Sequence, residues 1–217
     1  MDILIYGGGM LGRQVSHLVT NHFADQFRIL GFIDDVQPPG IAVVDSLETV
    51  GSLDHVASND QRGPKKVRVV FAIGYTSMQG RWQAYQNVKS KGYDLVSLKH
   101  PNSSVEPSAD LGEGVIVLAG AIVDQFVVVG DVSYLHNGSI VGENCNIGAN
   151  NYVSAGATFG GSVVVGNNNF FGINSAVVND ITIGNNNFVN AGALIYRPLG
   201  NDLRMVEYRE QREVTNK

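Results

Sequence analysis

A six-residue repeat runs through the second half of this chain and restricts its fold more than any other feature. Every sixth residue from position 105 to position 195 is apolar. The series consists of Val105, Leu111, Val117, Val123, Val129, Leu135, Val141, Ile147, Val153, Phe159, Val165, Phe171, Val177, Ile183, Val189 and Ile195. With 44% apolar residues in the chain, such a series would arise by chance on the order of once in a million. The repeat predicts a parallel β-helix in which each hexad forms one short strand.

A weaker period of eighteen residues is superimposed on the period of six. Aromatic residues recur at this interval at Tyr152, Phe170 and Phe188. Three hexads per coil predict a triangular prism of about five coils. The competing all-β fold, a β-sandwich, would show turn signals every 8–12 residues or so and not an unbroken six.

The repeat region has an unusual composition. Residues 111–196 contain no lysine and no arginine, but 14 glycines and 14 asparagines. These two residue types tolerate a positive φ better than the others. We expect the tight turns between hexads to account for both enrichments.

Several classes of protein are excluded by the composition of the whole chain. The net charge is −5 and no basic cluster occurs, which argues against nucleic-acid binding. No apolar run approaches the ~20 residues of a membrane span, and the start MDILIYGGG reads as a strand and not as a signal peptide. The single cysteine, Cys145, fits a reducing compartment, and its small inward position predicts a core residue and not a nucleophile. We expect a cytoplasmic protein.

Residues 1–101 read as a separate α/β domain. Apolar strands are predicted at 2–6, 28–34, 67–73 and 93–98, and helices at 10–23, 46–50 and 77–91, with Ser46 as a cap. The polar segment 54–66 is expected to be an exposed loop. Alternating strands and helices favour a small parallel sheet covered by helices.

The first strand of this domain leads into a glycine-rich turn. Gly7, Gly9 and Gly12 match G-x-G-x-x-G between a strand and a helix, and Asp34 lies 22 residues after Gly12. This pattern binds a pyrophosphate at a helix N-terminus and a ribose on the acid. Only about 100 residues precede the repeats, few for a full dinucleotide fold with a hydride-accepting substrate site, so a nucleotide or nucleotide-linked sugar is favoured over NAD. A tight turn without a ligand is the third interpretation.

Four motifs and the repeats together resemble a known bacterial family. The motifs are YGGGMLG at the first turn, GFIDD after the second strand, AIGY after the third and KHPNSSVEPSA before the repeats. They resemble sugar acyltransferases that acetylate nucleotide-linked amino sugars or sialic acid, over essentially the whole chain. The resemblance implies an N-terminal half-Rossmann α/β domain (1–101), an all-β left-handed parallel β-helix of hexapeptide repeats (102–198) and a C-terminal helix or tail (199–217).

The resemblance also implies partners and site residues. The protein would be a homotrimer with active sites between neighbouring prisms, using acetyl-CoA or a related acyl-CoA and no metal. The nucleotide-linked sugar would lie near Gly8, Gly9, Asp34, Asp35, Gly74 and Arg81. Acyl-CoA would lie along the coil edges, with candidate contacts at Ser154, Gly160, Gly161, Gly172 and Arg197. Packing is an alternative role for Arg81, and capping of the prism is one for Arg197.

The chain departs from the family at the catalytic base. The family carries a histidine in a V-D-H-[DE]-C-like segment, where this chain has Glu143, and a second histidine where it has Ser154. The only histidine of the repeats, His136, lies eighteen residues before Ser154, on the same predicted edge. Three interpretations stay open: His136 is the base, Glu143 is the base with a raised pKa, or no residue is a dedicated base.

The sequence therefore predicts an enzyme that transfers an acyl group from acyl-CoA to a nucleotide-linked sugar. The alternative is a trimer that binds nucleotide sugars without catalysis. We do not expect a zinc enzyme of β-helix architecture, because the three histidine ligands of such a zinc site are missing.

Overall fold

The structure is a computed structural model that describes residues 1–59 and 63–205 of the chain. Its N-terminal domain is built on a five-stranded sheet with the order β3-β4-β2-β1-β5. The strands are β1 (Asp2–Tyr6), β2 (Arg28–Ile33), β3 (Ala42–Val44), β4 (Leu47–Gly51) and β5 (Val67–Phe71). All neighbours pair in parallel except β3 with β4. The inner strand β1, between β2 and β5, is buried on both faces, which is why it is an almost continuous apolar run.

Three helices accompany this sheet: α1 (Met10–His22), α2 (Leu53–Asn59) and α3 (Met78–Ser90). Ser77 caps α3, since its hydroxyl accepts a hydrogen bond from the Gly80 amide at 3.0 Å. The helix predicted at 46–50 is wrong. That segment forms β4, where the β-branched Thr49 and Val50 favour pairing with β2. The loop predicted at 54–66 is also wrong in part, because α2 occupies its beginning.

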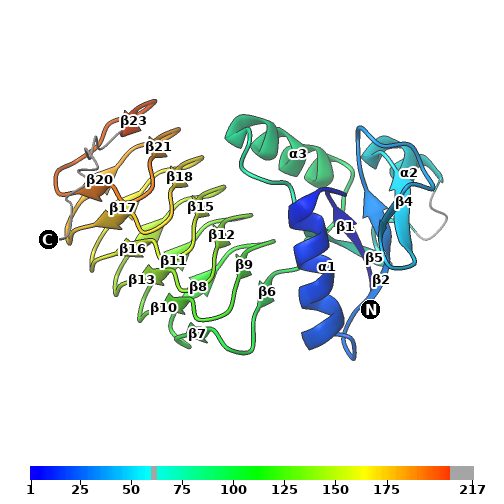
Figure 1. Ribbon diagram of the computed structural model, residues 1–217, viewed down its shortest axis with the longest axis horizontal. Helices are drawn as coiled ribbons and strands as arrows, with labels where there is room; N and C mark the ends of the chain where they lie inside the picture. Colours follow the sequence, from blue (N-terminus) through cyan, green and yellow to red (C-terminus); the bar gives the residue numbers. More distant parts are fainter. Residues whose placement is uncertain (60–62, 206–217) are drawn as a thin grey trace, which may run out of the picture.

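The repeats form the left-handed parallel β-helix that the sequence predicts, with three faces (Figure 1). Face 1 consists of β6 (Leu98–Lys99), β9 (Ile116–Val117), β12 (Tyr134–Leu135), β15 (Tyr152–Val153), β18 (Phe170–Phe171), β21 (Phe188–Val189) and β23 (Arg204–Met205). Face 2 consists of β7 (Ser104–Val105), β10 (Ile122–Val123), β13 (Ile140–Val141), β16 (Thr158–Phe159), β19 (Ala176–Val177) and β22 (Leu194–Ile195). Face 3 consists of β8 (Asp110–Leu111), β11 (Val128–Val129), β14 (Asn146–Ile147), β17 (Val164–Val165) and β20 (Thr182–Ile183).

The register of the coils follows both periods of the sequence. Strands pair with an offset of eighteen residues, as between Tyr134 and Tyr152, except for the last pair, β21 with β23, where the offset is sixteen. From Val117 to Ile195, every apolar residue of the hexad series is buried in one continuous core. The chain passes from face 1 to face 2 to face 3, so the prism has three edges, named here edge 1–2, edge 2–3 and edge 3–1.

Positive φ in the turns at these edges accounts for only five of the 14 glycines and five of the 14 asparagines of residues 111–196. Each edge carries a column of residues with positive φ, such as Gly120, Gly138 and Gly156 on edge 1–2. Of the 14 asparagines of the repeats, only Asn144, Asn150, Asn168, Asn174 and Asn186 have a positive φ. The others include a buried column in which Asn151, Asn169 and Asn187 hydrogen-bond one coil to the next. Conformation and hydrogen bonding between coils therefore both require asparagine, and the expectation from φ alone was incomplete.

The N-terminal domain packs on face 1 of the prism. Helix α1 lies between its sheet and that face (Figure 1), whereas α3 packs on the opposite side of the sheet and contacts edge 3–1. The contact includes a column of stacked outward rings, Tyr134, Tyr152, Phe170 and Phe188, whose neighbouring centroids are 4.5 to 5.9 Å apart. β6 already pairs with β9, so pairing with the β-helix begins before residue 101.

One residue at this junction has a costly backbone. Val132 has a φ of 49° and is fully buried, packed with the core of the N-terminal domain. The left-handed region is unfavourable for a β-branched residue. The burial of this side chain between the domains offsets that cost.

At the other end, a helix was one of the two expectations for 199–217, and the described part of that segment is not helical, because Arg204 and Met205 form β23. The remainder of that segment, from 206, lies outside the described residues.

Candidate functional site

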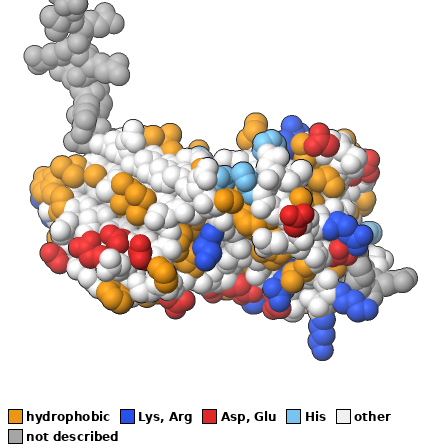
Figure 2. Space-filling view, turned by 90° about the horizontal axis from the view of Figure 1, so that it is seen from below, with side chains coloured by type: hydrophobic (Ala, Val, Ile, Leu, Met, Phe, Trp, Pro, Cys, Tyr) orange, Lys and Arg blue, Asp and Glu red, His pale blue; other side chains and the backbone are white. Residues whose placement is uncertain are grey.

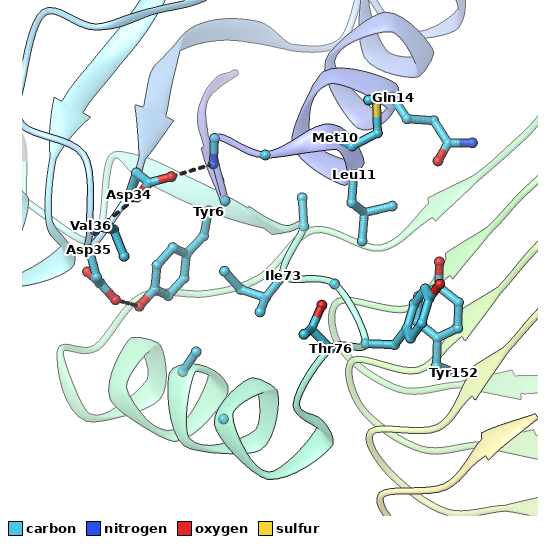
Figure 3. Close-up of a pocket in the computed structure, with 18 residues that line it drawn as sticks. Tyr6, Met10, Leu11, Gln14, Asp34, Asp35, Val36, Ile73, Thr76 and Tyr152 are labelled. Atoms are coloured by element: carbon cyan, nitrogen blue, oxygen red, sulfur yellow. Dashed lines mark hydrogen bonds between the residues drawn. The ribbon is translucent and has the colours of Figure 1, made fainter. Parts of the chain in front are cut away.

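A pocket of about 690 Å³ lies where the glycine-rich turn, the loop after β5 and face 1 meet (Figure 3). Its lining includes five of the six residues that the sequence suggests for the nucleotide sugar, Gly8, Gly9, Asp34, Asp35 and Gly74. Figure 3 shows Met10, Leu11 and Gln14 of α1 on one side and Tyr152 of the β-helix beyond the loop that carries Ile73 and Thr76. The pocket is therefore shared by both domains.

The glycine pattern is required by close packing at the turn. Gly7 has a φ of +121°, and a Cβ at Gly12 would overlap the Gly7 carbonyl oxygen. These two glycines allow α1 to approach the end of β1. The turn and its helix are thus built as the sequence pattern predicts.

Asp34 already holds three backbone amides. One carboxylate oxygen accepts a hydrogen bond from Gly8 at 3.0 Å, and the other accepts from Val36 at 2.9 Å and Gln37 at 3.0 Å. The carboxylate therefore fixes the loop after β2 against the glycine-rich turn. This positioning role was not visible in the sequence, where Asp34 was read only as a ligand for a ribose.

Asp35 is held in a similar way. Its carboxylate accepts hydrogen bonds from the Tyr6 hydroxyl and, at 3.0 Å, from the Leu53 amide at the start of α2. Burial, followed by the hydrogen bond to Asp35, raises the pKa of Tyr6. Tyr6 consequently stays protonated and donates to Asp35 at neutral pH.

Aromatic residues that sequence reasoning missed form the wall next to the β-helix. The Tyr75 ring lies 4.8 Å from the Tyr152 ring and 4.6 Å from the Phe170 ring, measured between centroids. Burial raises the pKa of Tyr152 to about 12. Tyr152 and Phe170 could have been singled out from their eighteen-residue spacing, but nothing in the sequence pairs them with Tyr75.

The sixth candidate, Arg81, does not line the pocket. Only 1% of Arg81 is exposed, and its guanidinium lies 5.1 Å from the centroid of the Phe71 ring. Its Nε donates to the Ile73 carbonyl at 3.0 Å, and another nitrogen donates to Asn150 on edge 3–1. Burial lowers the pKa of Arg81 to about 10, so the side chain remains charged at neutral pH.

His136 lies on edge 1–2, next to the pocket. Tyr134 donates a hydrogen bond at 3.3 Å to Gln14, a pocket residue, and its ring centroid is 5.8 Å from that of His136. The Nδ1 atom of His136 accepts the Asn137 amide at 2.8 Å. Burial lowers the pKa of His136, which keeps the imidazole neutral at pH 7. Ser154 follows one coil later on the same edge, as the repeat predicts.

The other candidate residues are divided between two edges of the prism. Glu143, Gly160, Gly161 and Arg197 lie on edge 2–3, while Ser154 and Gly172 share edge 1–2 with His136. Glu143 is exposed, and its carboxylate leaves no room for a Cβ at Gly161. Within one chain, face 2 therefore lies between His136 and Glu143. Cys145 is a buried core residue, as predicted.

The charges of the pocket are unbalanced. Two aspartates and no lysine or arginine are found among the lining residues that the structure describes. The cap of α1 at this pocket, Gly9, is extended and makes no side-chain hydrogen bond to the helix. The first turn of α1 therefore presents backbone amides and the positive end of the helix dipole to the pocket.

Comparison with solved structures finds proteins of the family that the motifs resemble. No protein-family model matches the chain, and no curated protein matches it in sequence. A solved structure of perosamine N-acetyltransferase from Caulobacter crescentus, a histidine-to-asparagine mutant in complex with CoA and GDP-perosamine, is 27% identical. It has a TM-score of 0.84 and is matched over 94% of this chain and 92% of that chain. The chain is similar along its length to bacterial sugar acyltransferases of the hexapeptide-repeat type.

Two further solved structures are similar to this chain. The acetyltransferase domain of PglB from Neisseria gonorrhoeae FA1090 is 25% identical, with a TM-score of 0.81, over 91% of this chain and 92% of that domain. WeeI from Acinetobacter baumannii AYE is 18% identical over 94% of this chain and 96% of its own, with a TM-score of 0.57, which shows the fold alone. The Caulobacter and Neisseria structures support sugar acyl transfer as the activity.

The described residues provide neither a candidate metal site nor a membrane-spanning helix. Among the residues that the structure describes, no group of three or more histidine, cysteine or acidic side chains could hold a metal ion. None of the helices in this part of the chain is long and apolar enough to cross a membrane.

Proposed function

We propose that the protein transfers an acetyl or related acyl group from acyl-CoA to a nucleotide-linked sugar. The observation that carries this proposal is the position of the glycine-turn pocket, which lies between the nucleotide-binding type of turn and face 1 of the β-helix, where Tyr134 contacts both the pocket residue Gln14 and His136. CoA and GDP-perosamine bound to the similar Caulobacter enzyme support the same pair of substrates.

The nucleotide would bind at the N-terminal side of this pocket. Since no cationic side chain is found among its described lining residues, the diphosphate would rely on the backbone amides at the start of α1 and on the helix dipole. The sugar would then extend past Gln14 and Tyr152 toward edge 1–2. Acyl-CoA would lie along the coil edges, with contacts at Ser154, Gly160, Gly161, Gly172 and Arg197.

The reaction requires one proton acceptor, and His136 is the residue we assign to it. The amine or hydroxyl of the sugar attacks the thioester carbonyl, forming a C–N or C–O bond while the C–S bond breaks. His136 takes the proton of the nucleophile and returns it to the departing CoA thiolate. Backbone amides of the turns stabilise the oxyanion.

Ligand-induced stabilisation and release of CoA test this function together. UDP-, dTDP- and GDP-linked amino sugars and acetyl-CoA are screened by thermal shift, and free CoA thiol is measured for each pair. A ligand at about 100 times its Kd adds about 2.7 kcal/mol to the free energy of unfolding. If no nucleotide sugar and no acyl-CoA stabilises the protein, the proposal is wrong.

The assembly we propose is a homotrimer with face 2 turned toward the threefold axis. Face 1 is covered by the N-terminal domain, whereas face 2 exposes an apolar row in which Ile122, Ile140 and Leu194 are 37–42% exposed. Such a row is typical of an interface. In this arrangement, edge 1–2 of one subunit meets edge 2–3 of the next, which brings His136 of one chain toward Glu143 of its neighbour.

Replacing Ile140 with glutamate should convert the trimer to monomers, because it places three charges around the axis. Sedimentation velocity measures the change. The matched control is Val164→Glu on face 3, where the outward valine is 45% exposed and the trimer should persist. Equal behaviour of the two variants would reject face 2 as the interface.

The acidic limb of the kcat profile should lie below a pH of about 6.5, the ordinary pKa of histidine. Burial lowers the pKa of His136, so the neutral, proton-accepting form persists as the pH falls and is lost only at the lowered pKa. The profile is measured from about pH 5 to 8 at saturating substrate. The same limb in the residual activity of His136→Gln would assign it to another group.

A non-catalytic nucleotide-sugar-binding trimer is the second candidate, and one contact favours it. Because the Asn137 amide donates to Nδ1 of His136, the neutral ring carries its proton on Nε2 and donates there. Proton acceptance at Nε2 requires the other tautomer and loss of this contact. Binding of nucleotide sugars without release of CoA for any tested pair would support this candidate.

A further inference from the structure

An unbroken chain of side-chain hydrogen bonds runs from Arg81 along edge 3–1. Arg81 donates to the Oδ1 atom of Asn150. Asn150 donates to Asn168 at 2.9 Å, Asn168 donates to Asn186 at 3.1 Å, and Asn186 donates to the Asp202 carboxylate at 2.9 Å. Three coils of the prism thus connect a buried guanidinium to an exposed carboxylate.

The two ends of this chain fix the direction of every amide in it. Arginine can only donate and a carboxylate can only accept. Each asparagine therefore turns its oxygen toward Arg81 and its NH₂ group toward Asp202. All three amide dipoles point the same way, with their negative ends toward the cation and their positive ends toward the anion.

The chain also runs from the interior to solvent. Asn150 is fully buried, Asn168 is half-buried, and Asn186 and Asp202 are exposed. A buried charge without compensation is costly, and none of the ion pairs found among the described residues involves Arg81. The aligned amides stabilise the charged guanidinium where a carboxylate does not reach.

Arg81 acts on the pocket through the loop that follows β5. Its Nε holds the Ile73 carbonyl, and Asn150 also donates to the Met78 carbonyl at 2.9 Å. The loop between these two anchors contains Ile73, Gly74, Tyr75 and Thr76, all of which line the pocket. Both ends of this pocket wall are therefore tied to one asparagine of the β-helix.

We propose that Arg81 is a positioning residue for nucleotide-sugar binding, held in its charged, extended state by the Asn150–Asn168–Asn186–Asp202 chain. The role in substrate binding rests on the proposed function, whereas the coupling along the chain does not. Arg81 sets the position of the pocket loop without touching the substrate, and Asp202 influences that position from three coils away.

The first experiment compares Arg81→Lys with the matched control Arg68→Lys, which changes an exposed arginine of β5. A lysine cannot bond Ile73 and Asn150 together. Arg81→Lys should raise KM for the nucleotide sugar about tenfold, in line with the loss of one hydrogen bond to a charged group. KM for acyl-CoA and kcat should change little, and amide exchange of residues 73–76 should accelerate. An unchanged KM and unchanged exchange would overturn the proposal.

The second experiment tests the coupling and needs no substrate. Asp202→Asn is introduced into the natural chain and into Arg81→Met, and the melting temperatures are compared. The shift caused by Asp202→Asn should be smaller in the Arg81→Met background, where no cation remains to align the amides. Equal shifts would show that the chain carries no coupling. If the natural protein binds no nucleotide sugar, the proposed function fails, while exchange and this cycle still decide the role of Arg81.

Discussion

Replacing His136 with alanine should lower kcat by about 10²–10⁴-fold, the range expected for loss of a positioned general base. The half-buried ring lies beside Tyr134, which contacts pocket residue Gln14, so its removal affects the proton transfer and not the nucleotide pocket. KM for the nucleotide sugar should therefore change little. The measurement is steady-state release of CoA thiol, with His17→Ala, an exposed histidine of α1, as the matched control.

Mixed trimers test whether His136 of one chain shares a site with Glu143 of the neighbouring chain. If His136 of one chain and Glu143 of the next share a site, His136→Ala and Glu143→Gln chains will each be impaired alone. Assembled together, some interfaces regain both natural residues, and activity returns in part. No recovery in mixed trimers would place the two residues in separate sites. Full activity of His136→Ala would remove it from the mechanism.

Replacing Gly12 with alanine should destabilise the N-terminal domain by about 3–5 kcal/mol, at the upper end for a single substitution. The added Cβ would overlap the Gly7 carbonyl oxygen, which is backbone and cannot move aside without distorting the turn. The pocket would be lost together with the turn, and with it the stabilisation by nucleotide sugars. Chemical denaturation followed by circular dichroism gives the free energy of unfolding.

Gly9→Ala is the control for this prediction. Gly9 belongs to the same turn, but its φ is −78° and a Cβ there would meet nothing within 4 Å. The variant should keep its stability within about 0.5 kcal/mol. A comparable loss of stability in both variants would mean that the turn is sensitive to any side chain, and that the packing of Gly12 is not the cause.

The sequence predicted those parts of the fold that a periodic pattern encodes. The inward series from Val117 to Ile195 and the eighteen-residue register both follow from repetition, because one geometry is imposed on every coil. The glycine-rich turn was likewise readable, since its short spacing is a local backbone requirement. Segment 46–50 was misread because the capping signal of Ser46 is local, whereas β4 depends on pairing with β2.

The contents of the site were harder to predict because they depend on distant contacts. Asp34 and Asp35 were located, but not their bonds to the amides of Gly8 and Leu53. The role of Arg81 stayed open between substrate contact and packing, because no local signal shows that an arginine will be buried against a residue 69 positions away. Its partner Asn150 looked like any other turn residue of the repeats.

The coil register makes the prism sensitive to the length of insertions and deletions. A change of eighteen residues adds or removes a whole coil and keeps every later residue on its own face and edge. A change of six preserves the inward apolar residues but rotates everything after it by one third of a turn. Placed between Asn150 and Asn186, such a change would keep the core intact and still break the hydrogen-bonded asparagine column. Because the N-terminal domain is bound to one face and one edge, the β-helix can change in length by whole coils of eighteen residues but not by the six residues of its sequence repeat.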